Sequence, residues 1–179
     1  MGINNRPHVL HADVRHLDRD GKLLWSADGL DNMLHDQGET AILSAYFATT
    51  MATYGAPPAN LYFGLDARTT LVEADTLASL VGEITTTSGY SRQAVATSGP
   101  GTTGQDFYIN QPAAYYRADS KTVTFTASGA AWSVAKNLFL CTVTSGSTGK
   151  LICSLALTAD RTLQDGDSLN ASMYIGLSE

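Results

Sequence analysis

Short apolar segments separated by turn-forming residues constrain the fold of this 179-residue chain more than any other feature. The segment 121–128, KTVTFTAS, shows the pattern best, because Val123, Phe125 and Ala127 alternate with threonines. Similar segments are NLYFGL, NLFLCTV, KLICSLAL and SLNASMYIGLS. Segments that recur about every ten residues with turns between them are typical of antiparallel sandwiches. We therefore predict a mainly β chain, with an antiparallel, jelly-roll-like β-sandwich over residues 31–179.

One helix is predicted near residues 37–50, on the N-terminal side of the sandwich. Asp36 is placed to cap it, and Glu39 follows three residues later, as in a capping box. The apolar face would contain Ile42, Leu43, Tyr46, Phe47 and Met51. A second, shorter helix is expected in ADTLASLVGEI, with Leu77, Leu80 and Val81 facing inward.

The first 30 residues are predicted to form an N-terminal arm. HVLHADVRHL and KLLWS flank the turn sequence DRDG, so residues 8–25 are expected to form a β-hairpin. This region carries much of the charge of the chain. We expect it to lie outside the main domain.

The stretch TSGSTGKL, residues 144–151, resembles a phosphate-binding loop because of its Gly-Lys pair. Such a loop needs a glycine at the position of Thr144 and a hydroxyl at the position of Leu151, and it must open a helix. The strand-like segment LICSLAL follows instead. The stretch is therefore predicted to be a hairpin loop, with Gly146 and Gly149 available for positive φ.

The hairpin also predicts a register and a state for the two cysteines. A turn centred on Ser147 would pair Phe139 with Leu155, Cys141 with Cys153, and Val143 with Leu151. A disulfide is then geometrically conceivable. No secretory signal is visible, so we expect a reducing cytosol and two buried free thiols.

Charge and hydropathy argue against two classes of partner. The net charge is −6, and the eleven Lys and Arg residues are scattered, so no nucleic-acid footprint is expected. No apolar run reaches the ~18–20 residues of a membrane span.

The sequence offers no group of residues suited to catalysis or metal binding. On a strand, His8 and His16 share one face and His11 lies on the other, which is poor geometry for a metal, so exposed or interface histidines are expected. Two acidic pairs are better explained as turns than as calcium loops: Asp18 with Asp20, and Asp165 with Asp167. No nucleophile–base arrangement can be assembled. We therefore expect no enzymatic activity, no cofactor and no metal.

Four residues are candidate interface residues: Arg92, Tyr115, Tyr116 and Trp25. Arg92 stands in a small-residue strand, either as a buried ion-pair partner or as an interface anchor. Tyrosines mark protein interfaces and also sugar-binding surfaces. A carbohydrate-binding platform would consist of Tyr90, Tyr115, Tyr116 and Trp132, although a tryptophan in a strand is more often part of the core.

From about Asn32 to Ser178 the chain resembles small structural proteins of tailed bacteriophages. The resemblance is carried by DTLASLVGE, GYSRQAV, SKTVTFTASGAAWSVAKNLFL, SGSTGKLICSLAL and GDSLNASMYIGLS, in this order. It implies a virion protein assembled in the host cytoplasm, and no catalytic residue is carried over from it.

Within this class we expect a head decoration or cement protein that stabilises the capsid. Its partners would be other virion proteins, either the major capsid protein or tail and portal components, and a homo-oligomer is expected. The alternative is a tail, collar or fibre-associated protein. A host-carbohydrate-binding module is a third reading.

Overall fold

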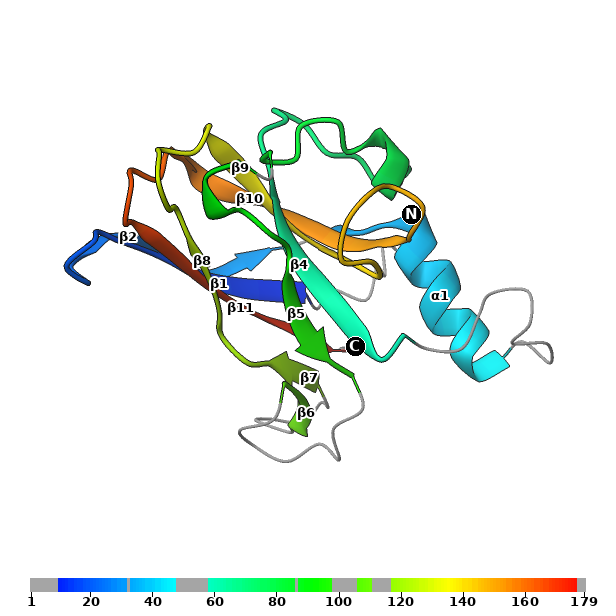
Figure 1. Cartoon of the computed structure of the whole chain (residues 1–179). Helices are drawn as coiled ribbons and strands as arrows, with labels where there is room; N and C mark the ends of the chain where they lie inside the picture. The colour runs from blue at the N-terminus through cyan, green and yellow to red at the C-terminus, as the bar shows by residue number, and fades with distance from the viewer. Residues whose placement is uncertain are drawn as a thin grey trace, which may run out of the picture.

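Two antiparallel β-sheets packed face to face form the body of the protein (Figure 1). The computed structural model describes residues 10–31, 33–47, 58–85, 87–97, 106–110 and 117–176. Every strand pair in these ranges is antiparallel. The predicted β-sandwich with one helix is confirmed.

The first sheet is built around the C-terminal strand, β11 (Ser168–Gly176). β11 pairs with β1 along one edge, and with β8 and β7 in turn along the other. The remaining strands extend the sheet to both sides, giving the order β2-β1-β11-β7-β6. Their bounds are β1 (Leu10–Leu17), β2 (Leu23–Asp31), β6 (Phe107–Asn110), β7 (Arg117–Ser120) and β8 (Val123–Thr126).

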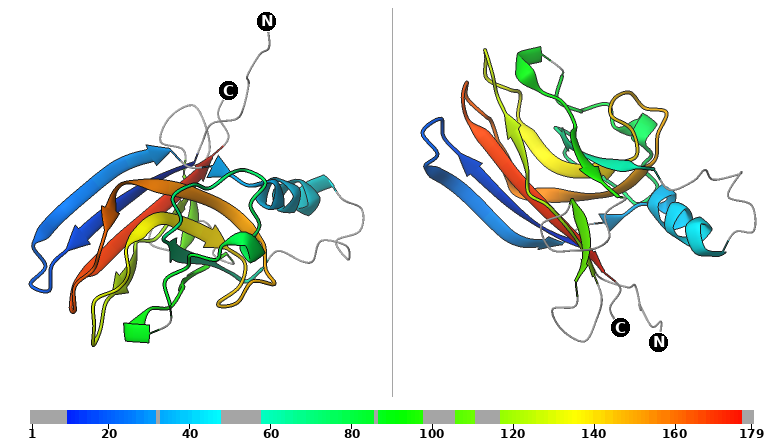
Figure 2. Two further views of the ribbon diagram at one scale, coloured as in Figure 1. Left: turned by 90° about the horizontal axis from the view of Figure 1, so that it is seen from above. Right: turned by 60° about the horizontal axis from the view of Figure 1, so that its bottom comes forward.

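The second sheet has the order β3-β10-β9-β4-β5. Its bounds are β3 (Met33–Leu34), β4 (Asn60–Asp66), β5 (Gln93–Ala96), β9 (Ala135–Cys141) and β10 (Leu151–Arg161). The helix α1 (Asp36–Phe47) packs against β10. Two short 3-10 helices, η1 (Leu77–Ser79) and η2 (Thr87–Gly89), lie in the connections that follow β4 (Figure 2).

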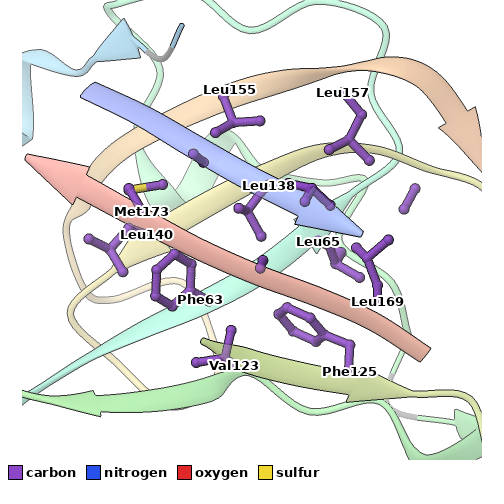
Figure 3. Close-up of a cluster of buried hydrophobic side chains, with 14 of the residues drawn as sticks. Phe63, Leu65, Val123, Phe125, Leu138, Leu140, Leu155, Leu157, Leu169 and Met173 are labelled. Carbon is purple, nitrogen blue, oxygen red and sulfur yellow. The ribbon is translucent and has the colours of Figure 1, made fainter. Parts of the chain in front are cut away.

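The main core lies between the two sheets (Figure 3). Alternation brings one face of each strand inward, as KTVTFTAS predicts: Val123, Phe125 and Ala127 are all buried. Phe63 and Leu138 from the second sheet are fully buried in the same cluster. Burial of apolar surface on this scale is the main source of stability in such a fold.

A second apolar cluster covers the outer face of the second sheet. We call residues 67–82 the cap loop; its Leu77 and Leu80 pack on Phe139, Cys141 and Leu151. The second sheet is therefore buried on both faces, which explains its long apolar runs. Val81, predicted to face inward with Leu77 and Leu80, is instead 86% exposed, because the 3-10 helix ends at Ser79 and the chain turns outward.

The N-terminal hairpin exists but is not a separate arm. β1 lies between β2 and β11, and it pairs with β11 from Leu10 to Leu17. Its Ala12 and Val14 belong to the main core. The expectation of an arm over residues 1–30 is therefore wrong for the described part, since apolar alternation in β1 completes the first sheet.

The helix begins at Asp36 as predicted, and the structure describes it as far as Phe47. Ile42, which was expected on the buried face, is 39% exposed. The other residues of that predicted face lie outside the side chains that the structure describes. The helix therefore begins where the acidic residues Asp36 and Glu39 predicted it, and Ile42 is the one residue of the predicted buried face that the structure shows to be exposed.

The β9–β10 hairpin forms, but its register differs from the prediction. A bulge between Leu151 and Cys153 shifts the pairing, so that Leu151 lies opposite Cys141, and Cys153 opposite Leu140. The two cysteines then belong to different apolar clusters on opposite faces of the sheet. Both are buried free thiols, as expected.

Gly64 in β4 is a close-approach position that we expect to tolerate no side chain. A Cβ there would overlap the ring of Phe139 in the neighbouring strand. Gly64→Ala is expected to lower the free energy of unfolding by about 1–3 kcal/mol, because overpacking displaces the ring. Urea denaturation measures the change. Ala94→Val, which adds carbon at an exposed position of the neighbouring β5, is the control; equal effects of the two would contradict the assignment.

Candidate interaction surface

Arg92 is the buried centre of a polar cluster that holds the β9–β10 hairpin loop. Its Nε and Nη2 donate to the two carboxylate oxygens of Glu83, both at 2.7 Å. Nη1 donates to the carbonyl oxygen of Val143 and Nη2 to that of Gly146, both at 2.9 Å. The side chain of Arg92 is only 3% exposed. Of the two roles that the sequence left open, the structure shows the buried ion-pair partner.

Tyr90 extends this cluster into the main core. Its hydroxyl donates to Glu83 at 3.0 Å and accepts from the amide of Leu65 at 2.9 Å. Burial, followed by the charge of Glu83, raises the pKa of Tyr90. The ring packs edge-on against Trp132 and stacks on Phe125.

The predicted carbohydrate platform is therefore wrong for two of its four members. Tyr90 and Trp132 are each only 4% exposed, because they fill the core. Tyr115 and Tyr116 lie outside the described residues.

The loop that Arg92 holds is exposed and uncharged from Thr144 to Thr148, and it ends at the half-buried Lys150. Gly146 has φ +72°, as the hairpin prediction requires. Gly149 serves a different purpose, since a Cβ there would press against the side chain of Val143. Strand β10 follows, so the helix that a phosphate loop needs is not formed.

The cap loop is closed at its base and clamped by ion pairs. The amide of Ala67 donates to the carbonyl oxygen of Gly82 at 2.8 Å, and Asp66 and Glu83 form an isolated β-bridge. Arg68 reaches Asp66 at 3.4 Å and both oxygens of Asp75 at 3.3 Å. Compact loops closed in this way are frequently functional.

The fully exposed residues of the cap loop are uncharged, whereas its charged residues, Arg68, Glu73 and Asp75, are half-buried. Its exposed residues are Thr69, Thr70, Val72, Ala74, Ala78 and Val81. Figures 1 and 2 show the β9–β10 hairpin loop beside η1, and Arg92 joins that loop to Glu83 at the base of the cap loop. We call these exposed cap-loop residues, together with Thr144–Thr148, the neutral face.

His35 connects the cap loop to the second sheet. It is fully buried. Its Nδ1 lies 3.1 Å from the carbonyl oxygen of Glu73, which can only accept, so Nδ1 carries the proton. Nε2 then accepts from the hydroxyl of Ser154 at 2.8 Å. Burial lowers the pKa of His35 below its usual value, against the opposing charge of Asp75.

The outer face of the first sheet differs from the neutral face because it is charged. One row of paired residues crosses five strands: Asp31, His11, Tyr174, Asp119 and Tyr108. His11 lies 3.2 Å from Asp31. Arg117 pairs with Asp119 at 2.7 Å and stacks on Tyr174 at 4.1 Å. Asp31 and Asp119 of this row thus each contact a side chain of the same sheet.

The histidines and acidic turns form no metal site in the described part of the chain. His16 is buried and lies 3.2 Å from Asp167, contrary to the expectation that these histidines are exposed or at an interface. His8 lies outside the described residues. No group of three or more His, Cys, Asp or Glu that could hold a metal occurs among the described residues.

One member of each acidic pair, Asp18 and Asp167, stabilises a turn, as predicted. Asp18 accepts from the amides of Asp20 and Lys22, and Asp167 accepts from that of Gln164. In the part of the chain that the structure describes, no helix is long and apolar enough to cross a membrane.

Trp25, the fourth predicted interface residue, is half-buried on β2. It packs against the main core, and the guanidinium of Arg161 lies 4.8 Å above its ring. Its role at an interface stays a prediction.

Sequence reasoning missed Glu83 and Val72, and it placed Val81 in the interior. One signal could have indicated them: between residues 67 and 97 the charged residues are only Arg68, Glu73, Asp75, Glu83 and Arg92. When a long neutral stretch contains a few charges of both signs, these charges are expected to form ion pairs with one another. The partners of each charge depend on the fold.

Removing the guanidinium of Arg92 is expected to destabilise the protein and release the hairpin loop. Arg92→Met removes the donor of the Val143 and Gly146 carbonyl groups and leaves Glu83 with the Tyr90 hydroxyl but without the guanidinium, which we expect to cost about 3–5 kcal/mol. Arg92→Lys restores the charge without the planar, multidentate donor geometry of the guanidinium, so we expect it to recover little of the lost stability. Denaturant unfolding and proteolysis within Thr144–Thr148 measure both effects. Arg15→Ala, at an exposed pair 4.0 Å apart, is the control and should change stability by under about 1 kcal/mol. An Arg92→Met variant as stable as this control would refute the anchoring role.

His35 is expected to make stability fall in mild acid. Its pKa is lowered in the folded state, so below the unfolded value of 6.5 the unfolded chain binds more protons, and the free energy of unfolding decreases as pH falls. Unfolding free energies measured between about pH 8 and pH 5 test this. His35→Gln should be less stable but should lose this part of the pH dependence. The same slope in both proteins would show that another group causes it.

Comparison with known proteins places these features in a family. Residues 33–175 match the family described as podophage GP4 fiber I protein gp80. No curated protein matches the chain. The match runs from β3 to Ile175 in β11 and so includes the whole second sheet, the cap loop and α1. It supports the resemblance to phage structural proteins at the level of the class. Because it spans most of the sequence, the chain belongs to the podophage GP4 fiber I protein gp80 family and is a bacteriophage virion protein.

Proposed function

We propose that this chain is a non-enzymatic structural component of a tailed-phage virion, associated with a fibre. The observation that carries the proposal is the family match over residues 33–175, whose description names a fibre protein. Its partners are other virion proteins of the tail and portal region. Assembly takes place in the host cytoplasm.

The use of buried polar groups supports a structural role. Arg92, Tyr90 and His35 each connect segments that are far apart in the sequence, and their donors and acceptors are engaged by backbone or by other side chains. Burial raises the pKa of Cys141, which keeps it a thiol. These groups rigidify loops, as a subunit that presents fixed surfaces to its neighbours requires.

The fibre-associated reading is preferred to the head decoration that the sequence led us to expect. Both readings need a stable β-domain with a defined surface, so the fold does not distinguish them. The family description favours the fibre, and nothing in the comparisons names the capsid.

Immunogold electron microscopy of intact particles tests the location. Antibodies raised against the isolated chain are expected to label the tail end of the particle, at its fibres. An antibody to the major capsid protein provides the control for head labelling. Gold spread evenly over the head would overturn the fibre assignment and support a head decoration protein instead.

A further inference from the structure

The exposed charged side chains of this protein lie outside the cap loop and the β9–β10 hairpin loop. Among the described residues the exposed charged side chains are Asp13, Arg15, Arg19, Asp20, Lys22, Asp28, Asp31, Asp36, Glu39, Lys121, Asp160 and Asp165. Acidic residues outnumber basic ones in this set, in line with the net charge of −6. None of them belongs to the cap loop or to the β9–β10 hairpin loop.

Two sets of charges near the neutral face are paired within the protein. Arg68 pairs with Asp66 and Asp75 beneath the cap loop, and Arg92 pairs with Glu83 at its base. Glu73 and Lys150 are half-buried beside the face, and the amide of the exposed Asp36 donates to the carbonyl oxygen of Glu73. The exposed side of the cap loop is made of Thr, Ala and Val. Val81 is 86% exposed and Val72 is 51% exposed. Depletion of charge around exposed apolar side chains is characteristic of the centre of a protein interface.

The charge distribution indicates which partner fits this face. Two copies of an acidic chain repel each other when their charged faces meet, and like charges in contact are costly. In a two-fold contact the same patch meets itself, so a residue near the axis faces its own copy. A charge there would be opposed by an identical charge, whereas Val72, Val81 and the neighbouring threonines meet no such penalty.

We propose that the neutral face is a contact between two copies of this chain, with Val81 and Val72 near its centre. The ion pairs of Arg68 and the fork of Arg92 hold the two loops of the face in place before contact. Such preorganisation reduces the entropy lost on association. The contact concerns the chain itself and goes beyond its location in the particle, so it can be tested on the purified protein.

The strongest competing surface is the edge strand β2. It presents Leu23 and Leu24, which are 52% and 51% exposed. Edge strands are ready sites for pairing with another chain. Lys22, Asp28 and Asp31 are exposed on or next to this strand, however, and charged residues of this kind protect natural edges from pairing.

Sedimentation equilibrium of the full chain separates the two surfaces with a matched pair of variants. Val72 and Leu24 are equally exposed, so Val72→Asp adds a negative charge to the neutral face and Leu24→Asp adds one to β2 at a matched position. We expect a self-associating wild type, and a dissociation constant raised at least about tenfold by Val72→Asp and by Val81→Asp, with Leu24→Asp unchanged. A monomeric wild type, or loss of association in Leu24→Asp alone, would overturn the proposal. Denaturant unfolding confirms that each variant is folded.

Cross-linking gives a second test that weakens no contact. Both native cysteines are buried, so Ala78→Cys adds an exposed thiol on the neutral face and Ser26→Cys adds one on β2. A short bismaleimide is expected to join two Ala78→Cys chains and to leave Ser26→Cys chains single. The reverse result would assign the contact to β2 and refute the neutral face. Because neither test uses particles, a failure here is distinct from a failure of the fibre assignment.

Discussion

The paired Arg92 and Glu83 connect parts of the chain that would otherwise be independent. Arg92 precedes β5, Glu83 closes the cap loop, and the accepting carbonyl groups belong to the β9–β10 hairpin loop. A buried guanidinium has five donors and must satisfy them, so it can bring several segments to one point. The pair takes two charges out of water, which is offset only when each oxygen and each N–H has a partner. Tyr90 supplies one of the remaining partners from the core side.

The sandwich is asymmetric as a result. The second sheet is covered on its outer side by the cap loop, which packs on Phe139 and Leu151, while the outer side of the first sheet carries paired polar residues. An antiparallel sheet can present one polar face to water, and the first sheet does so. The second sheet is apolar on both faces and needs a cover. The cover then becomes the outer surface, and its fully exposed residues are uncharged.

The N-terminal hairpin shows how a family boundary and a structural boundary can differ. The family match begins at Met33, after β2. Strand β1 nevertheless pairs with β11 over its whole length and contributes Ala12 and Val14 to the core. The hairpin is therefore part of the sandwich in this protein, and its charged turn at Asp18–Gly21 lies at one end of the first sheet.

The amino-acid sequence by itself determined most of the strands, the turns and the start of the helix, but it did not indicate β3, β6 and β7. The features that it determined are local: alternation in Val123, Phe125 and Ala127, an acidic residue at Asp36, and glycine where φ is positive at Gly146. It also predicted correctly that Cys141 and Cys153 are free thiols. Only the tertiary structure decided the hairpin register, the place of β1, the exposure of Val81 and the partners of Arg92. Each depends on contacts between residues distant in sequence, since a bulge shifts every later pair and a buried charge accepts whichever partners the fold brings to it.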